Sequence, residues 1–301
     1  METISRQKGP LYLELVPALG GTVRRFTWHG HDILRPLPDS ASATVNQGGS
    51  FALVPYSNRI AHGQFEFSGH AYQLARNFGD HPHTIHGNAW QNPWQLSGLG
   101  EDFIELTMLH SVDGTDAATQ CAAWPWPYCV VQRFTLRDDE LHISLRYHNL
   151  AAVTVPVGLG FHPYFPRASE AEIQFTAENV VLNGEDALPH AVSAIPERWD
   201  YRHWRRPQAG SIDNCFAHWD GKAAVRWPNE RIMATISSSD AAHAILFIPP
   251  ADRDFVAIEP VSHINDAINN HGFGDPSCAM HSLPAGAAFE ITMSIKVCFY
   301  D

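Results

Sequence analysis

The 301-residue sequence has no apolar run that approaches the roughly 20 residues needed to cross a lipid bilayer. Its beginning, METISRQKGPLYLEL, lacks the apolar stretch of about 7–15 residues that a secretory signal contains. The five cysteines are scattered and never spaced as Cys-x-x-Cys, so we predict neither a disulfide framework nor a zinc knuckle. We therefore expect a cytoplasmic protein without a membrane partner.

Basic residues are also few. Lysine and arginine total 20 against 32 aspartates and glutamates, which gives a formal net charge of −12 at pH 7. Nucleic acids are polyanions that bind basic surfaces, so a nucleic-acid partner is not expected. Charged residues make up only 17% of the chain and hydrophobic residues 45%, which is typical of a globular protein with a large core.

Sustained helical periodicity is absent as well. Short runs that alternate apolar and polar residues, rich in Val, Ile, Thr and Phe, recur instead and indicate strands. The clearest runs are residues 11–16, 22–28, 63–69, 70–75, 103–109, 130–136, 141–149, 171–177, 243–249 and 289–299. Turn residues at 68–70 and 138–139 predict two hairpins, and only residues 40–49 indicate a small helix.

Many short strands without a βαβ rhythm predict an all-β protein, a large antiparallel β-sandwich or barrel. No repeat or low-complexity linker interrupts the chain. We therefore expect one domain that spans residues 1–301.

Histidine, in contrast, is abundant, with 18 residues. Imidazole titrates near neutral pH, and it is a common proton shuttle and metal ligand. HPHTIHGNAW (residues 81–90) holds three histidines, but no glutamate follows at the spacing of a cupin-like metal site, and the prolines and glycine exclude a helix. We predict no metal and no cofactor, with His86 as a loop imidazole that faces a pocket. A metal-dependent, cupin-like enzyme remains the alternative.

The stretch GLGFHPYFP (residues 158–166) places His162 at the end of an apolar run. Pro163 cannot donate to a β-ladder, so the strand should end there. The glycines at 158 and 160 allow another group to approach the backbone closely. Taken alone, His162 is more often a buried core residue than a catalyst.

Two further stretches carry polar residues where strands are predicted to end. Asn58 and Arg59 lie at a strand-to-loop transition, where side chains reach a cleft, although a turn asparagine and a surface arginine are the alternative. Residues 254–270, DFVAIEPVSHINDAINN, should deliver Glu259 from an apolar strand into a loop. Burial would raise the pKa of its carboxyl group, which suits a general base, unless the strand end is exposed to solvent.

The order of these motifs resembles that of the aldose 1-epimerase (galactose mutarotase) family. NRIAHGQFEFSGHAYQL, IHG, WPWPY, PVGLGFHPYF, DNCF and IEPVSHINDAIN follow one another as they do in that family, and the resemblance covers residues 11 to 299. It implies a large antiparallel β-sandwich and an isomerase of carbohydrate metabolism. Such an enzyme interconverts the α and β anomers of an aldose and needs no cofactor.

The resemblance also implies roles for single residues. Glu259 matches the catalytic base and His162 the acid, while His86 would hydrogen-bond the ring oxygen or assist the acid. Arg59 and Asp213 would orient the sugar. Family members often have Gly-Gly after the loop histidine where this chain has Gly87 followed by asparagine, so the preferred sugar stays open.

Other residues are added as sugar contacts from their position alone. Asn58 precedes the matched arginine, and the tryptophans Trp90 and Trp124 lie beside loops, where their rings offer stacking faces to sugar C–H groups. We expect a small-molecule sugar as the only partner, and a monomer or a homodimer.

Two alternatives share the scaffold. A hexose-6-phosphate 1-epimerase needs a phosphate site, and YRHWRR (residues 201–206) offers three arginines, although such a cluster is more often a solvated face. A non-catalytic carbohydrate-binding protein would keep Arg59 and the aromatic residues but could lose the acid or the base.

Overall fold

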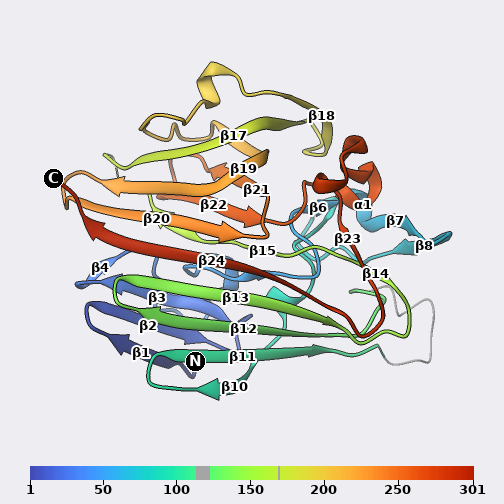
Figure 1. The fold of residues 1–301 in the computed structure, drawn as a ribbon, viewed down its shortest axis with the longest axis horizontal. Coiled ribbons are helices and arrows are strands. Elements are labelled where there is room, and N and C mark those ends of the chain that lie inside the picture. Colours follow the sequence, from blue (N-terminus) through green and yellow to red (C-terminus); the bar gives the residue numbers. More distant parts are fainter. Residues whose placement is uncertain (113–122, 169) are drawn as a thin grey trace.

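The structure is a computed structural model that describes residues 1–112, 123–168 and 170–301 (Figure 1). Its strands are β1 (Ile4–Lys8), β2 (Leu11–Val16), β3 (Thr22–Trp28), β4 (His31–Asp32), β5 (Ala52–Leu53), β6 (Arg59–Ile60), β7 (Gln64–Phe67), β8 (His70–Gln73), β9 (Thr84–Ile85), β10 (Gln95–Leu99), β11 (Phe103–His110), β12 (Tyr128–Arg137), β13 (Glu140–Asn149), β14 (Val155–Val157), β15 (Gly160–Phe161), β16 (Tyr164–Pro166), β17 (Glu172–Asn183), β18 (Pro189–Ala194), β19 (Ile212–Trp227), β20 (Ile232–Ser239), β21 (His243–Ile248), β22 (Phe255–Val261), β23 (His281–Leu283) and β24 (Ala288–Phe299).

Helical segments are short. They are the α-helix α1 (Ala267–Asn270) and the 3-10 turns η1 (Val45–Gln47), η2 (Ala61–Gly63), η3 (Ala89–Gln91), η5 (Glu197–Trp199), η6 (His271–Gly274) and η7 (Pro276–Cys278). None of the helices in the described ranges is long and apolar enough to cross a membrane. The small helix expected at residues 40–49 is only the three-residue turn η1, because Gly48, which follows it, has an extended backbone.

A 14-stranded sheet dominates the molecule, and its main path runs β10-β11-β12-β13-β24-β20-β19-β21-β22-β15-β5. Strands β16, β17 and β18 branch from this path, and all strand pairs in the described part of the chain are antiparallel. The prediction of an all-β, antiparallel protein is therefore confirmed.

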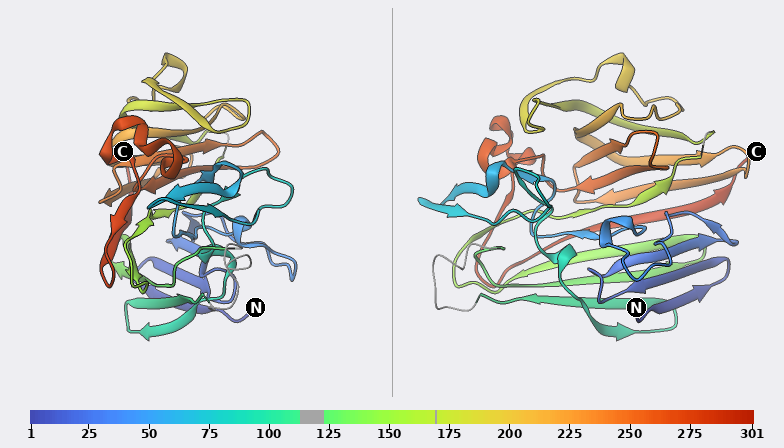
Figure 2. Two further views of the ribbon diagram at one scale, coloured as in Figure 1. Left: turned by 90° about the vertical axis from the view of Figure 1, so that its right-hand side faces the viewer. Right: turned by 180° about the vertical axis from the view of Figure 1, so that it is seen from behind.

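The four-stranded sheet β1-β2-β3-β4 forms a second layer. Figure 1 shows it behind β11, β12 and β13, and the reverse view in Figure 2 shows it in front of them. Alternate residues of β2 and β12 are buried, and apolar side chains from both layers join one core. This is the pattern expected of two sheets packed face to face.

Both predicted hairpins are confirmed. Strands β7 and β8 pair on either side of Ser68 and Gly69, and β12 and β13 pair on either side of Asp138 and Asp139. Ser68, Gly69 and Asp138 have positive φ angles, as tight turns between twisted strands require. The alternation in the sequence located these strands well but missed the full length of β19, which has 16 residues.

Candidate active site

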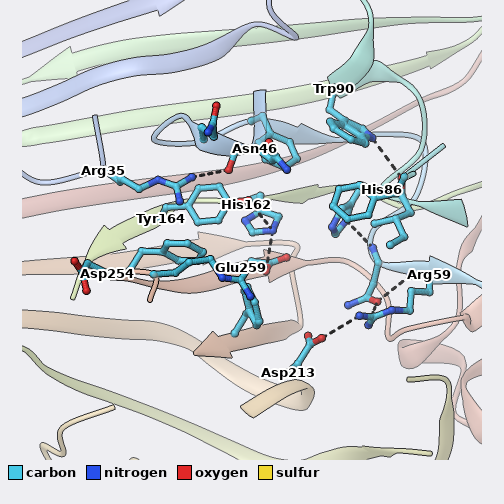
Figure 3. Close-up of a pocket in the computed structure, with 18 residues that line it drawn as sticks. Arg35, Asn46, Arg59, His86, Trp90, His162, Tyr164, Asp213, Asp254 and Glu259 are labelled. Atoms are coloured by element: carbon cyan, nitrogen blue, oxygen red, sulfur yellow. Dashed lines mark hydrogen bonds and ion pairs between the residues drawn. The ribbon is translucent and has the colours of Figure 1, made fainter. Parts of the chain in front are cut away.

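One face of the large sheet forms the floor of a cavity of about 530 Å³ (Figure 3). In the strand registers, Asp213 of β19 lies opposite Phe247 of β21, Phe247 lies opposite Ala257 of β22, and Ala257 lies opposite Tyr164 of β16. Residues directly opposite each other project to the same face of a sheet. Side chains from distant parts of the sequence therefore form one row across four strands.

The next row places His162 opposite Glu259. Strands β15 and β16 pair with β22 in the same register on either side of a short interruption, through the pairs Gly160 with Val261 and Tyr164 with Ala257. His162 lies two residues after Gly160 and two before Tyr164, and Glu259 lies midway between their partners Ala257 and Val261. The same register therefore places His162 opposite Glu259. The sheet register itself therefore brings the two side chains together.

Prolines occupy the interruption. Pro163 follows His162, and the strand β15 ends before it, as the sequence predicts. The carbonyl oxygen of Pro260 lies beside Gly160, so the nitrogen of Pro260, which has no hydrogen to donate, also faces the unpaired stretch. Strand β22 consequently continues to Val261, and the prediction that Glu259 begins a loop was wrong.

The imidazole of His162 contacts the carboxyl group of Glu259, with Nε2 3.3 Å from Oε1. Both residues are buried, with 6% and 2% of their surface exposed. Burial raises the pKa of Glu259 well above its ordinary value; the negative charge of Asp213 adds to this, and Arg59 opposes it. The sequence-based expectation of a raised carboxyl pKa is therefore met.

Burial also lowers the pKa of His162 well below its ordinary value, and positive charge on His86 and Arg35 acts in the same direction. The opposite shifts of His162 and Glu259 favour a carboxylic acid beside a neutral imidazole over an ion pair. Nδ1 of His162 and Oε2 of Glu259 are buried and have no hydrogen-bond partner among the described residues. Such unpaired atoms in a cavity are available to a polar ligand.

His86 is held beside this pair by a reciprocal clamp with Asn58. The N–H of His86 donates to the carbonyl oxygen of Asn58 (2.9 Å), and the N–H of Asn58 donates to Nδ1 of His86 (3.1 Å). Both residues have positive φ angles, which the two hydrogen bonds hold in place. Burial, followed by repulsion from Arg59, lowers the pKa of His86 to about 3, so its ring is neutral at physiological pH.

Gly87 allows the loop that carries His86 to approach the chain closely. Its φ is +68°, and a Cβ atom there would lie 2.0 Å from the carbonyl oxygen of Val54. Its own carbonyl oxygen accepts a hydrogen bond from Nε1 of Trp90 (3.1 Å). The ring of Trp90 stacks on Phe51, which in turn packs against His162. Trp90 therefore supports the loop and lines the cavity.

Arg59 connects the loop to the sheet. Its guanidinium donates to Oδ2 of Asp213 (2.9 Å) and to Oδ1 of Asn58 (3.0 Å), and its backbone N–H donates to Oδ1 of Asn265 (3.0 Å). Figure 3 shows this ion pair at one end of the cavity, beyond Glu259. Arg59 therefore joins the loop of Asn58 to strand β19.

Comparisons with known proteins identify the family of the chain. The family profile described as aldose 1-epimerase matches residues 7–296. The chain belongs to the aldose 1-epimerase family. It is 29% identical to the uncharacterized protein YphB of Escherichia coli (strain K12) over 286 residues, which cover 92% of this chain and 93% of that protein.

Solved structures show the same fold. The crystal structure of an Escherichia coli K12 protein superposes with a TM-score of 0.88 at 26% identity and covers 99% of both chains. The galactose 1-epimerase of Lactobacillus acidophilus NCFM superposes with a TM-score of 0.75 at 14% identity, over 100% of this chain and 99% of that one. The fold is thus that of the galactose mutarotase-like proteins.

Seven of the eight residues that the sequence assigned to an epimerase site line this cavity: Asn58, Arg59, His86, Trp90, His162, Asp213 and Glu259. Trp124 does not. It is 1% exposed and packs in the core against Tyr56, Phe65 and Trp126, so its expected role in sugar stacking is wrong. The apolar surroundings of the WPWPY segment bury the indole away from the loops.

Several lining residues were missed. They are Arg35, Asn46, Gln47, Phe51, Phe78, Ile85, Tyr164, Phe247, Arg253, Asp254 and Phe255. Alternation could have found two of them. Phe255 stands four residues before Glu259 on β22, and Tyr164 begins β16 two residues after His162. No local pattern marks Arg35 or Arg253, which come from loops.

The arginines that a hexose-6-phosphate 1-epimerase would use, in residues 201–206, lie outside this cavity. None of residues 201–206 lines the cavity, and Arg202 instead pairs with Asp200, with 2.6 Å between Nη2 and Oδ2. His83, one of the three histidines of the HPHTIHGNAW segment, has other partners than a metal ion. His83 uses Nδ1 to accept from the N–H of His62 and Nε2 to contact the carbonyl oxygen of Asp186.

A different group of side chains has the composition of a metal site. Potential ligand atoms of His218, Asp275 and Cys278 lie within 4.8 Å of one another, and they are the one such group found in the described ranges. These residues do not line the cavity. Nε2 of His218 already contacts Oδ2 of Asp275 (3.0 Å).

Proposed function

We propose that this member of the family is an aldose 1-epimerase that interconverts the α and β anomers of an aldose by ring opening and reclosure. The single observation that supports this most is the buried pair of His162 and Glu259 in a cavity of about 530 Å³. That volume lies within the range of ~300–1,000 Å³ found for small-molecule sites.

The reaction needs an acid and a base side by side. In a cyclic aldose, the anomeric hydroxyl oxygen and the ring oxygen are bonded to the same carbon. Glu259 as carboxylate takes the hydroxyl proton, His162 as imidazolium gives a proton to the ring oxygen, and the bond between the anomeric carbon and the ring oxygen breaks to leave an aldehyde. Rotation about the adjacent C–C bond and the reverse proton transfers then close the ring on the other face.

One proton shared by the pair is enough for this cycle. In the form that burial favours, the proton lies on Glu259; the reactive form has it on His162, across a contact of 3.3 Å. The positive charge of Arg59 favours the carboxylate form of Glu259 and so supports the transfer. After reclosure the proton count of the pair is unchanged.

His86 is proposed as a hydrogen-bond donor to the sugar. Its Nδ1 accepts from the N–H of Asn58, so the neutral ring carries its proton on Nε2. Because its pKa is lowered to about 3, His86 does not act as a second acid at neutral pH. Of the two roles expected from the sequence, the hydrogen bond to the ring oxygen is the one that its chemistry favours.

Arg59, Asp213 and Asn58 are proposed to hold the sugar hydroxyl groups at the other end. The ion pair between Arg59 and Asp213 leaves donor and acceptor positions that face the cavity. A polar site with oriented donors keeps the reacting carbon beside the acid and the base, and such positioning contributes strongly to the rate.

The test is the rate of anomerisation of fresh α-glucose and α-galactose followed by polarimetry. The wild-type protein should accelerate the change of at least one, and Glu259→Gln should lose about 10²–10⁴-fold of that rate. Glu66→Gln, which alters an exposed glutamate of β7 outside this cavity, is the matched control. A wild-type protein that binds aldoses without accelerating anomerisation would instead be a carbohydrate-binding protein.

A further inference from the structure

Two guanidinium groups of the cavity have no acidic partner. Arg35 and Arg253 both line it, and in the described residues neither forms an ion pair. Arg59, in contrast, is paired with Asp213. Figure 3 shows Arg35 and Arg59 on opposite sides of His162 and Glu259, so the two ends of the cavity differ in charge.

Arg35 is held in place by neutral groups. Its guanidinium lies over the rings of Tyr164 (4.0 Å) and Phe255 (4.4 Å), and Nη2 donates to the carbonyl oxygens of Asn46 (2.6 Å) and Gly48 (3.0 Å). These contacts orient the group without cancelling its charge. An arginine stays protonated in proteins, and a partly buried charge without a counter-ion is unfavourable.

Arg253 adds a second positive charge at this end. Its guanidinium lies 5.6 Å from the ring centroid of Phe247, and like charge from Arg253 lowers the pKa of Arg35 further after the larger effect of burial. Asp254 also lines the cavity, but its carboxylate is exposed and forms no ion pair among the described residues. This end therefore carries a positive excess in a chain whose formal net charge is −12.

The proposed orientation of the sugar places its atom C6 at the end of the cavity that holds Arg35. The exocyclic carbon C6 of an aldohexose is attached to the carbon next to the ring oxygen, so it lies on the side of the group that protonates that oxygen. In the proposed function this group is His162. Its ring stacks on Tyr164 at 4.4 Å, and Arg35 covers Tyr164. A substituent on C6 would therefore point toward Arg35.

We propose that the preferred substrate is an aldose with an anionic group on C6, a carboxylate or a phosphate, which Arg35 and Arg253 bind. The inference rests on the proposed function, because the position of the anomeric carbon beside Glu259 determines where C6 lies. A guanidinium binds either anion through charge-assisted hydrogen bonds from the N–H groups that other contacts leave free. The cluster at residues 201–206 is not needed for it.

The experiment compares kcat/KM for the anomerisation of glucose, glucuronate and glucose 6-phosphate, measured by NMR exchange or polarimetry. We expect at least one of the two anionic sugars to exceed glucose about tenfold or more. Arg35→Gln should reduce the ratio of the anionic sugar to glucose by about 10–100-fold, the size of a charge-assisted contact. Arg253→Gln, on an exposed loop where misfolding is not expected, should reduce the same ratio in the same direction.

Arg206→Gln is the matched control and should leave the ratio unchanged, because Arg206 lies outside the cavity. Preference for glucuronate identifies the carboxylate as the ligand, and preference for glucose 6-phosphate identifies the phosphate. If glucose is the best of the three substrates, or if neither arginine variant changes the ratio, the inference is overturned while the proposed function stands. If no aldose is anomerised faster than in buffer, the proposed function fails and the inference with it.

Discussion

Nε2 of His162 lies 3.3 Å from Oε1 of Glu259, and the two residues face each other across adjacent strands of one sheet. The distance between them is set by backbone pairing on both sides, between β15 and β22 and between β16 and β22. Groups positioned by strands are held more firmly than groups on loops. The acid and the base of the proposed reaction are therefore placed before any sugar binds.

The pH profile of kcat/KM should report His162 on its acid limb and Glu259 on its alkaline limb. The pair is active with one shared proton, so activity falls when it gains a second proton or loses its only one. In a solvent-exposed pair the remaining proton would lie on the imidazole. Because burial raises the pKa of Glu259 and lowers that of His162, the proton lies on Glu259 instead, and its loss gives the alkaline limb. An imidazole of His162 that is protonated across the plateau, measured by NMR of its ring nitrogens, would contradict this assignment.

Glu259→Gln should make the protein more stable at neutral pH. Above pH 4.5 the unfolded chain releases the Glu259 proton that the folded protein keeps, so the wild-type protein loses stability as pH rises, by up to about 1.4 kcal/mol per pH unit until its raised pKa is reached. The glutamine variant lacks this loss. Urea unfolding at pH 5, 6 and 7 should show a difference that grows with pH. A variant that is less stable than the wild type at all three values would refute the buried neutral carboxyl group.

Arg59→Gln and Asp213→Asn should move the alkaline limb of the profile in opposite directions. Asp213 raises the pKa of Glu259, so its replacement lowers that pKa and moves the limb to lower pH. Arg59 lowers the pKa of Glu259, so its replacement moves the limb to higher pH. Both variants should also lose about tenfold or more in kcat/KM, because each removes a charged contact. Equal displacements in one direction would show that the variants act through altered structure.

Trp90→Phe and Trp124→Phe should separate activity from stability. Trp124 is a core residue, so its replacement should lower the free energy of unfolding by about 1–3 kcal/mol and leave kcat/KM unchanged. Trp90→Phe removes the hydrogen bond to the carbonyl oxygen of Gly87 and loosens the loop of His86, so kcat/KM should fall. Thermal unfolding and polarimetry on the same samples test both outcomes. A loss of kcat/KM in folded Trp124→Phe would contradict its placement in the core.

Much of the fold could be predicted from local patterns. Alternation of apolar residues marked most of the long strands, and turn residues marked the hairpins at Ser68–Gly69 and Asp138–Asp139. Strand ends were less accurate. The sequence predicts a loop at Glu259, yet β22 continues through Pro260, because the nitrogen of Pro260, which has no hydrogen, faces a stretch where the neighbouring strands do not pair.

The candidate site was predicted in part for a different reason. Polar residues at the ends of apolar runs, in the order seen in a known family, pointed to His162, Glu259 and Arg59. The sequence did not indicate Arg35 and Arg253 as site residues, because each lies in a loop whose sequence has no recognisable pattern. Whether a loop residue reaches a cavity depends on how distant segments pack, and spacing along the chain does not contain that information.

By itself, the sequence determined an all-β chain with a formal net charge of −12, and it marked polar residues at the ends of apolar runs as candidates for a site. These properties follow from composition and from alternation along single strands, which are local. The tertiary structure alone decided that His162 stands opposite Glu259, that Trp124 is core, and that Arg35 and Arg253 leave one end of the cavity positive. Registers between strands and the burial of charge arise from contacts between segments far apart in the chain, so only the folded structure reveals them.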